Sequence, residues 1–225
     1  MIIAIDGPSG AGKSTVAKAV AKKLGFSCLD TGAMYRAVAW RALADGVALD
    51  DAEALGAIAR DKELSFGHVA GDPVPKRVFI DGTEVTDAIR TADIDKAVSP
   101  VSAAKPVREA LVAQQQRIGN AGDYVVEGRD IGTVVFPEAE VKVFLTASDE
   151  ERAHRRVRQN VDRGVGSIDY DEVLADLKRR DEHDSSRETS PLRPADDAVH
   201  IDSTESYIED VIERICEMAS SKANR

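Results

Sequence analysis

Apolar and polar positions at the start of the chain follow one another in the order expected for a strand, a loop and a helix. Residues 2–5 form a short apolar run, and residues 6–12 are rich in glycine. Apolar residues then recur at helical spacing over 16–24, before Gly25. Residues 26–29 begin a second apolar run. The pattern predicts a buried strand, a glycine-rich loop, an amphipathic helix and a second strand.

The rest of the chain alternates between apolar runs and helical periodicity. Such alternation favours an α/β fold in which helices cover both faces of a parallel sheet, giving three layers. We expect further strands over 124–126, 141–145 and 198–201, and helices over 31–43 (with Thr31 as its capping residue), 52–60, 106–119, 148–163, 170–183 and from 208 onward.

Two segments interrupt this alternation. Residues 64–99 carry scattered glycines and prolines and a hairpin pattern around Asp81-Gly82, which predicts a small β insertion. Residues 151–189 contain an arginine-rich helix, a glycine loop and a second helix, which is typical of a mobile lid. The predicted division is a core of residues 1–63, 100–150 and 190–225, an insertion of 64–99 and a lid of 151–189.

The glycine-rich loop fits the pattern G-x-x-x-x-G-K-[ST] at every fixed position and lies between a predicted strand and a predicted helix. Glycines let the backbone N–H groups turn toward phosphate oxygens, and the following helix adds the positive end of its dipole. Lys13 would reach the β and γ phosphates of ATP, and the Ser14 hydroxyl would bind Mg²⁺. A loop that only connects two elements is a weaker alternative. The predicted ATP-binding residues are Gly7, Pro8, Ser9, Gly10, Ala11, Gly12, Lys13, Ser14 and Thr15.

Composition and missing motifs exclude several classes of protein. The formal charge is −10, which argues against nucleic acid or an anionic membrane as partner. No apolar run reaches the roughly 18 residues of a membrane span, and we expect no cleaved signal. Two cysteines, Cys28 and Cys216, are far apart and too few for a disulfide framework, and neither has a neighbour at metal-binding spacing. A reducing, cytoplasmic location is therefore expected. A switch GTPase would add D-x-x-G and N-K-x-D, and neither motif occurs.

Arginines outside the loop indicate a second, anionic substrate. Arg36 follows the second strand and Arg129 the third, at the sheet edge where ligands of open α/β folds bind. Residues 152–163 hold five arginines and one acid. We expect that Arg152, Arg155 or Arg156, and Arg163 cannot all share one helix face, so that some of them are only solvated helix surface. The predicted catalytic residues are Lys13, Arg129, Arg155 and Arg158.

Several motifs together resemble the bacterial type of cytidylate kinase. The most specific are Asp-Thr-Gly-Ala-Met-Tyr-Arg at 30–36 and Gly-Arg-Asp-Ile-Gly-Thr-Val-Val-Phe-Pro at 128–137, and residues 5–15, 151–156 and 180–187 also match. The resemblance implies an insertion that binds a monophosphate. It also implies that ATP with Mg²⁺ phosphorylates CMP or dCMP. Glu127 departs from the aspartate of some relatives.

By the same resemblance, nine positions would bind the acceptor. Thr31 would line its site, and Arg36 and Arg129 would grip its phosphate. Ser99, Arg108 and Asp130 would contact cytosine, and Arg180, Asp184 and Arg187 would face the sugar and phosphate.

Two alternatives to this function stay open from the sequence. One is a related kinase that acts on uridylate, adenylate or shikimate, although the insertion and Arg129-Asp130 argue against shikimate. The other is a regulatory protein that binds a nucleotide without transferring phosphate. We expect a monomer.

Overall fold

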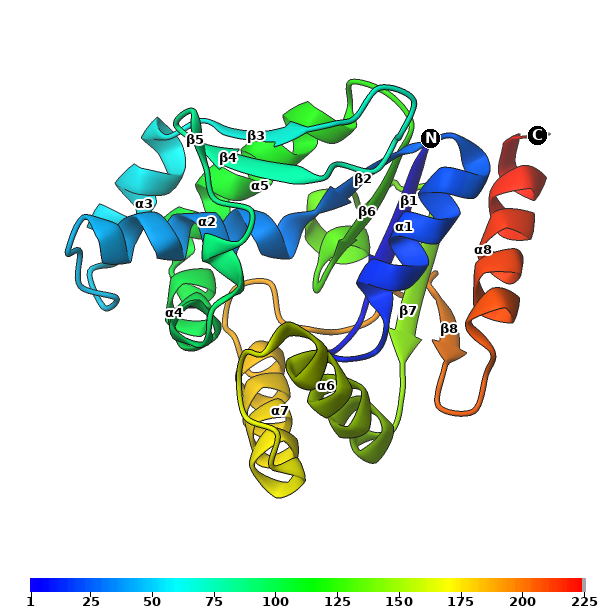
Figure 1. The fold of residues 1–225 in the computed structure, drawn as a ribbon. Coiled ribbons are helices and arrows are strands. Elements are labelled where there is room, and N and C mark those ends of the chain that lie inside the picture. Colours follow the sequence, from blue (N-terminus) through cyan, green and yellow to red (C-terminus); the bar gives the residue numbers. More distant parts are fainter. Residues whose placement is uncertain (224–225) are drawn as a thin grey trace.

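Five parallel strands form the central sheet of the protein (Figure 1). The computed structural model describes residues 1–223. The strand order is β2-β6-β1-β7-β8. The strands are β1 (Ile2–Asp6), β2 (Ser27–Asp30), β6 (Tyr124–Gly128), β7 (Val141–Thr146) and β8 (Val199–Asp202). The predicted α/β class with a parallel sheet is confirmed.

Helices cover both faces of this sheet because its strands are apolar on both sides. Successive side chains of a strand point to opposite faces. Ile3 and Ile5 are buried in the core formed with α1 (Lys13–Leu24) and α8 (Ile208–Ala223), whereas Ala4 faces the opposite core. That second core contains α2 (Thr31–Ala44), α3 (Ala52–Asp61) and α5 (Lys105–Gly119). The three layers are visible in Figure 1.

The predicted β hairpin is present as part of a three-stranded antiparallel sheet. Its strands are β3 (Leu64–Gly67), β4 (Arg77–Ile80) and β5 (Thr83–Glu84). Asp81 and Gly82 form the two-residue turn with φ of 51° and 75°, as a type I′ turn requires. The strand β4 contacts α2, so this small sheet packs on a helix that covers the central sheet.

The sequence prediction missed the helix that follows this sheet. After a short turn, η1 (Ala88–Arg90), the helix α4 spans Ala92–Ala103. Thr91 caps it, because its side chain accepts a hydrogen bond from the N–H of Ile94. Pro100 lies inside the helix, and the expected boundary at residue 99 falls within it. The division into core, insertion and lid remains a prediction.

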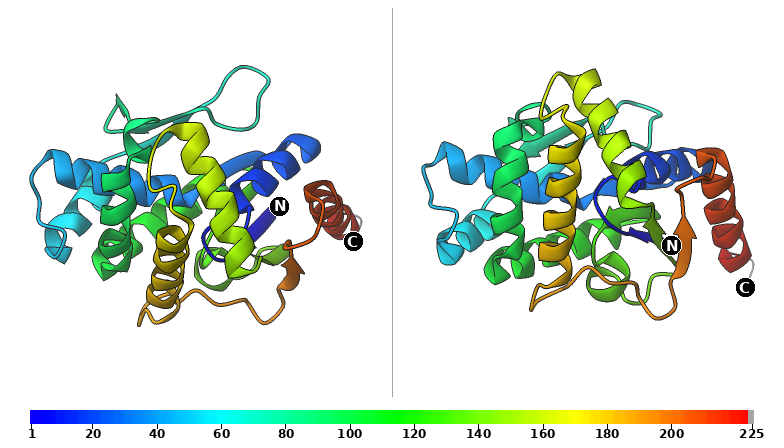
Figure 2. Two further views of the ribbon diagram at one scale, coloured as in Figure 1. Left: turned by 60° about the horizontal axis from the view of Figure 1, so that its bottom comes forward. Right: turned by 90° about the horizontal axis from the view of Figure 1, so that it is seen from below.

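Two helices lie beyond the carboxyl end of β7 (Figure 1). They are α6 (Asp149–Arg163) and α7 (Tyr170–Ser185), and they pack together through Ala153, Val173 and Leu177. Seen from below, α7 lies beside α4 (Figure 2). Ser148 caps α6, because its side chain accepts a hydrogen bond from the N–H of Glu151. Within residues 1–223, the structure has no helix whose length and apolar character would let it cross a membrane.

The first turn of the glycine-rich loop passes very close to β7. A methyl group on Gly7 would lie 2.0 Å from the carbonyl oxygen of Leu145, and Gly7 has a φ of +146°. Gly71, in the loop between β3 and β4, also has a positive φ, of +80°, but a methyl group there would have no atom within 4 Å. An alanine at Gly71 would therefore carry only the energetic cost of the left-handed backbone, whereas an alanine at Gly7 would also carry the cost of a steric clash.

We predict that Gly7→Ala lowers the free energy of unfolding by about 3 kcal/mol or more, because a backbone atom blocks the methyl group. Gly71→Ala should cost only about 1 kcal/mol, the usual penalty of a left-handed backbone. Urea denaturation of both variants measures the difference. Equal losses would contradict the close approach of the loop to β7.

Candidate active site

A cleft of about 1040 Å³ opens at the carboxyl ends of the central strands. The glycine-rich loop lines one part of it. Residues of α2, α4, α5 and the segment after β6 line another part, and residues of α6 and α7 complete the wall. Segments far apart in the sequence thus meet where the fold class predicts a ligand.

The loop turns its backbone toward the start of α1. Gly10 and Gly12 have φ of 82° and 93°, which glycine adopts without a steric penalty. The Lys13 ammonium is buried and donates to the carbonyl of Pro8 at 2.6 Å. Burial, with Arg129 nearby, lowers the pKa of Lys13 to about 7. Charge on this lysine is therefore sensitive to an anion that enters the cleft.

A carboxyl group lies behind the loop. Glu127, at 5% exposure, is the last residue but one of β6 and lies beside the Ser14 hydroxyl. Burial and the nearby Asp30 raise the pKa of Glu127 to about 7, although Lys13 opposes the shift. Its Oε1 atom is buried with no hydrogen-bond partner among residues 1–223. A hydroxyl oxygen and a carboxyl oxygen without a hydrogen-bond partner are ligands that suit Mg²⁺. This ion binds few protein side chains and keeps phosphate and water as its other ligands. The residues present thus fit this ion.

Asp6 joins the loop to the segment after β6. Its carboxylate accepts from the N–H groups of Ile131 and Gly132 at 2.8 and 2.7 Å. Burial raises the pKa of Asp6 to about 6, against the effect of these two hydrogen bonds. The contact fixes the turn Ile131–Val135, a wide helical turn that directly follows Arg129 and Asp130.

The opposite side of the cleft is built around Asp184, which is 2% exposed on α7. Its carboxylate accepts from Arg129 Nε at 3.0 Å and from Arg187. Burial alone would raise the pKa of Asp184, but Arg129 and Arg187 outweigh burial and hold it below its usual value. The aspartate therefore stays ionised and fixes two guanidinium groups.

A second buried ion pair lies deeper, between Arg108 on α5 and Asp130. Arg108 also donates to the carbonyl of Ser102 at 3.2 Å and stacks 5.5 Å from the centre of the Tyr35 ring. Arg187 donates to the Ser102 hydroxyl at 2.9 Å. These contacts join the two ion pairs into one polar floor of the cleft.

Three arginines of this side keep unsatisfied donors. In the described part of the chain, the buried Nε groups of Arg108, Arg180 and Arg187 have no hydrogen-bond partner. Burial, together with the positive charge of Arg129, lowers the pKa of Arg180 to about 10. Buried N–H groups that lack acceptors are costly, so a set of them in a cleft points to an anionic ligand.

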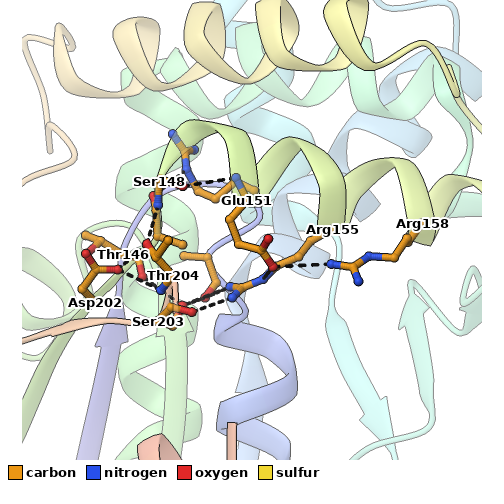
Figure 3. A network of polar contacts seen from close by, with 11 residues as sticks. Thr146, Ser148, Glu151, Arg155, Arg158, Asp202, Ser203 and Thr204 are labelled. Carbon is orange, nitrogen blue, oxygen red and sulfur yellow. Dashed lines mark hydrogen bonds and ion pairs between the residues drawn. The ribbon is translucent and has the colours of Figure 1, made fainter. Parts of the chain in front are cut away.

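Arginines of α6 divide between the two sides of the cleft and the solvent. Arg152 is buried and donates to the carbonyl of Ser9 at 3.0 Å. Arg155 reaches Ser203, after β8, with Nη1 3.0 Å from its hydroxyl and Nη2 2.6 Å from its carbonyl oxygen. Figure 3 shows this contact, and it shows Arg158 on the other side of Glu151. The Arg158 side chain is 69% exposed and pairs with Glu151 at 3.4 Å.

The structure brings most of the predicted site residues together. From Ser9 to Thr15 the loop lines the cleft, while Gly7 and Pro8 shape it from behind. Of the residues predicted to bind an acceptor, those in the lining are Thr31, Arg36, Arg108, Arg129, Asp130, Arg180, Asp184 and Arg187. Ser99 and Arg158 do not line it in this conformation, and their roles stay predictions.

One expectation about local structure was wrong. Asp30, not Thr31, caps α2, because its carboxylate accepts from the N–H of Ala33 at 2.9 Å. Thr31 instead donates to the carbonyl of Glu127 at 2.7 Å. The threonine hydroxyl therefore ties the start of α2 to the end of β6, the strand that leads into Arg129.

The expectation that the arginines of α6 do not share one face is confirmed. Arg156 and Arg163 both line the cleft, since residues seven apart fall on one side of a helix. Arg158 points into solvent and Arg152 is buried outside the lining. The cleft therefore receives only part of the positive charge of this helix.

The sequence prediction missed several cleft residues, among them Ser102, Asp95 and Gln159. Ser102 lies one helical turn after Ser99, and Asp95 is in the first turn of the same helix. Recognising the buried positions Ile94, Ala97 and Val101 as a helical stripe would have placed both. Gln159 lies between Arg156 and Arg163 in the lining.

Comparison with known proteins agrees with this geometry. A sequence model described as cytidylate kinase matches residues 3–221. The chain belongs to the cytidylate kinase family. It is 50% identical over 220 residues to a cytidylate kinase of Enterococcus faecalis, covering 98% of this chain and 96% of that protein. It is 46% identical over 221 residues to a cytidylate kinase of Bacillus subtilis, covering 98% and 97%.

A solved structure shows a similar fold. An uncharacterised protein of Eubacterium ventriosum superposes with a TM-score of 0.55 at 13% identity, covering 98% of this chain and 99% of that one. At that identity the likeness concerns the fold alone.

We predict that Asp184→Ala lowers the free energy of unfolding by about 3–5 kcal/mol, because it leaves Arg129 and Arg187 buried without their partner. Asp176→Ala on the same helix is the matched control. The Asp176 carboxylate pairs with Arg179 at 2.7 Å but its side chain is 57% exposed. Asp176→Ala should therefore lower the free energy of unfolding by less than about 1 kcal/mol.

Urea denaturation at several pH values checks this prediction. The pKa of Asp184 is lowered in the folded state, so its contribution is present above the ordinary aspartate pKa. The contribution is lost as the pH falls through the lowered value. The difference between the two variants should therefore shrink in acid, and a constant difference would contradict the ion-pair explanation.

Proposed function

We propose that the chain transfers the γ-phosphoryl group of ATP to the phosphate of CMP or dCMP, producing ADP and CDP or dCDP. The observation that carries the proposal is a single cleft with two kinds of anion site. A phosphate-binding loop lies on one side, and buried arginines with unsatisfied N–H groups lie on the other. Both sites adjoin, since Arg129 and Arg180 lower the pKa of Lys13.

The glycine-rich loop would bind the donor. Backbone N–H groups of the loop and of the first turn of α1 would surround the β-phosphate, and Lys13 would leave the carbonyl of Pro8 for the β and γ oxygens. Ser14 would hold Mg²⁺, with the Glu127 carboxyl behind it, and the bound ion would neutralise charge on the phosphates. Arg155 would cover the loop from α6.

The arginine side would bind the acceptor. Arg36, Arg129 and Arg180 would hold its phosphate, because planar guanidinium groups donate in pairs to phosphate oxygens. Arg187 and Asp184 would face the sugar, the part of the acceptor in which CMP and dCMP differ. Thr31 would line the same region.

The buried pair of Asp130 and Arg108 would contact the base. A carboxylate accepts a hydrogen bond from the exocyclic amine of cytosine, whereas uracil presents a carbonyl oxygen at that position. Arg108 can donate to the ring carbonyl. This pair favours cytosine over uracil, which argues for a CMP kinase rather than a uridylate kinase.

Phosphoryl transfer in this cleft needs no covalent enzyme intermediate. An oxygen of the acceptor phosphate attacks the γ-phosphorus, and the bond from that phosphorus to the oxygen bridging it to the β-phosphate breaks as ADP leaves. Lys13 and the arginines of both sides hold the two phosphates in line and stabilise the charge of the transition state. Helices α6 and α7 exclude water, which limits hydrolysis.

We predict that Lys13→Ala reduces kcat for CMP by about 10²–10³-fold, because it removes a buried positive charge from the transferring group. CMP affinity should stay within about twofold, since the lysine lies on the donor side. A coupled ADP assay and calorimetry measure the two effects. Lys22→Ala, at an exposed position on the same helix, should behave as wild type.

An acceptor screen with ATP and Mg²⁺ tests the function as a whole. CMP, dCMP, UMP, AMP, GMP and shikimate are compared by ADP release. Highest turnover with CMP or dCMP supports the proposal. ADP release that no acceptor stimulates would favour a regulatory nucleotide-binding protein.

We predict that Asp130→Asn lowers the preference for CMP over UMP, measured as the ratio of kcat/KM values, by about tenfold or more. An asparagine can turn its NH₂ group toward the uracil carbonyl, and it loses a charge-assisted hydrogen bond to cytosine. A thermal melt confirms that the variant is folded. An unchanged ratio would remove Asp130 from base recognition.

A further inference from the structure

One carboxylate lies among the arginines between α2, α4 and α6. Asp95, in the first turn of α4, accepts from Arg36 Nη2 at 2.5 Å through Oδ1. Its other oxygen, Oδ2, accepts from Arg156 Nη2 at 2.8 Å. Arg36 belongs to the proposed phosphate site of the acceptor, and Arg156 belongs to α6. We call Arg36, Asp95 and Arg156 the lid bracket.

The bracket is a built contact rather than a chance surface pair. The side chains of Arg36, Asp95 and Arg156 are 12%, 23% and 24% exposed. Burial would raise the pKa of Asp95, but Arg36 and Arg156 outweigh it and hold the pKa below its usual value. Half-buried charges with good geometry resist screening by water and salt better than exposed ones.

Asp95 restricts both arginines and leaves other donors free. Arg36 is also held by the carbonyl of Ile89, to which Nη1 donates at 3.2 Å. Arg156 is held by Gln159, to which its Nη1 donates at 2.9 Å. These two contacts fix the Arg36 guanidinium group between α2 and α4, and its remaining N–H groups are available to bind a ligand. An arginine held in this way loses less side-chain freedom when it binds a phosphate.

We propose that Asp95 is a positioning residue, which orients Arg36 for the acceptor phosphate and joins α6 to the acceptor side of the cleft through Arg156. The inference rests on the proposed function, because Arg36 matters only if the cleft binds a phosphorylated acceptor. It adds a residue that the resemblance to cytidylate kinases did not supply. Through this residue, the lid helix and the acceptor site share one carboxylate.

The test compares Asp95→Asn with Asp93→Asn. Both aspartates lie in the first turn of α4, but Asp93 is exposed and makes no ion pair within residues 1–223. Both variants lose one negative charge near the helix N-terminus, so the general effect of charge is matched. Asp95→Asn should raise KM for CMP about tenfold and leave KM for ATP within about twofold. Asp93→Asn should match wild type.

A second measurement reads the position of α6 without any activity. Trypsin can cut after Arg163, where α6 meets the loop 164–169, and mass spectrometry identifies that cut. Asp95→Asn should speed it several-fold because the bracket no longer holds α6 to α4. Asp95→Glu, which keeps the charge, should restore at least part of both effects.

Either an unchanged KM for CMP or an unchanged cleavage rate in Asp95→Asn overturns the proposal. A lower KM for CMP overturns it as well, since Asp95 would then compete with the phosphate. Should Asp95→Asn not fold, Arg156→Gln breaks only the half of the bracket on α6 and must reproduce the faster cleavage. If wild type does not phosphorylate CMP, the proposed function fails, while the cleavage comparison still decides whether the bracket holds α6.

Discussion

Two backbone N–H groups that donate to the Asp6 carboxylate hold the two halves of the cleft in register. Asp6 is the last residue of β1 and directly precedes the glycine-rich loop, whereas Ile131 and Gly132 directly follow Arg129 and Asp130. The donor loop and the segment that carries the proposed acceptor residues are thus joined by one buried carboxylate. Its burial opposes ionisation and its hydrogen bonds favour it, with a resulting pKa of about 6. This short link sets the position of the segment that follows β6 relative to the glycine-rich loop.

Aspartates make the arginine-rich side of the cleft compatible with a folded chain. Asp95, Asp130 and Asp184 each pair with at least one arginine, and Asp95 and Asp184 each pair with two. A buried guanidinium without a partner would be strongly destabilising. One carboxylate cannot satisfy all the N–H groups of two arginines, so donors remain free for phosphate. The net charge of −10 therefore does not oppose anionic substrates, because the sign that matters is local to the cleft.

The features of the fold and of the cleft that could be predicted from the sequence are those that a short stretch of residues determines by itself. The phosphate loop needs glycines at fixed positions between a strand and a helix, so its pattern alone places it. The hairpin was equally clear, because Asp81-Gly82 suits one turn type. The helix α4 was missed because a proline such as Pro100 ordinarily indicates a break, although the stripe of Ile94, Ala97 and Val101 has helical spacing. The lid bracket could not be predicted, since it joins three segments whose proximity only the tertiary fold determines.

Helix α6 carries arginines that contact both sides of the cleft. Adjacent positions on a helix point about 100° apart, so Arg155 and Arg156 face different neighbours. Arg155 contacts the phosphate loop and Ser203, on the proposed donor side, whereas Arg156 contacts Asp95, on the proposed acceptor side. Arg152, one turn earlier, anchors the base of the helix to the carbonyl of Ser9. Under the proposed function, a phosphate on one side would change the partners of only one of these two arginines. Closure of the helix would then require both substrates, and the γ-phosphate would be protected from water until an acceptor is in place.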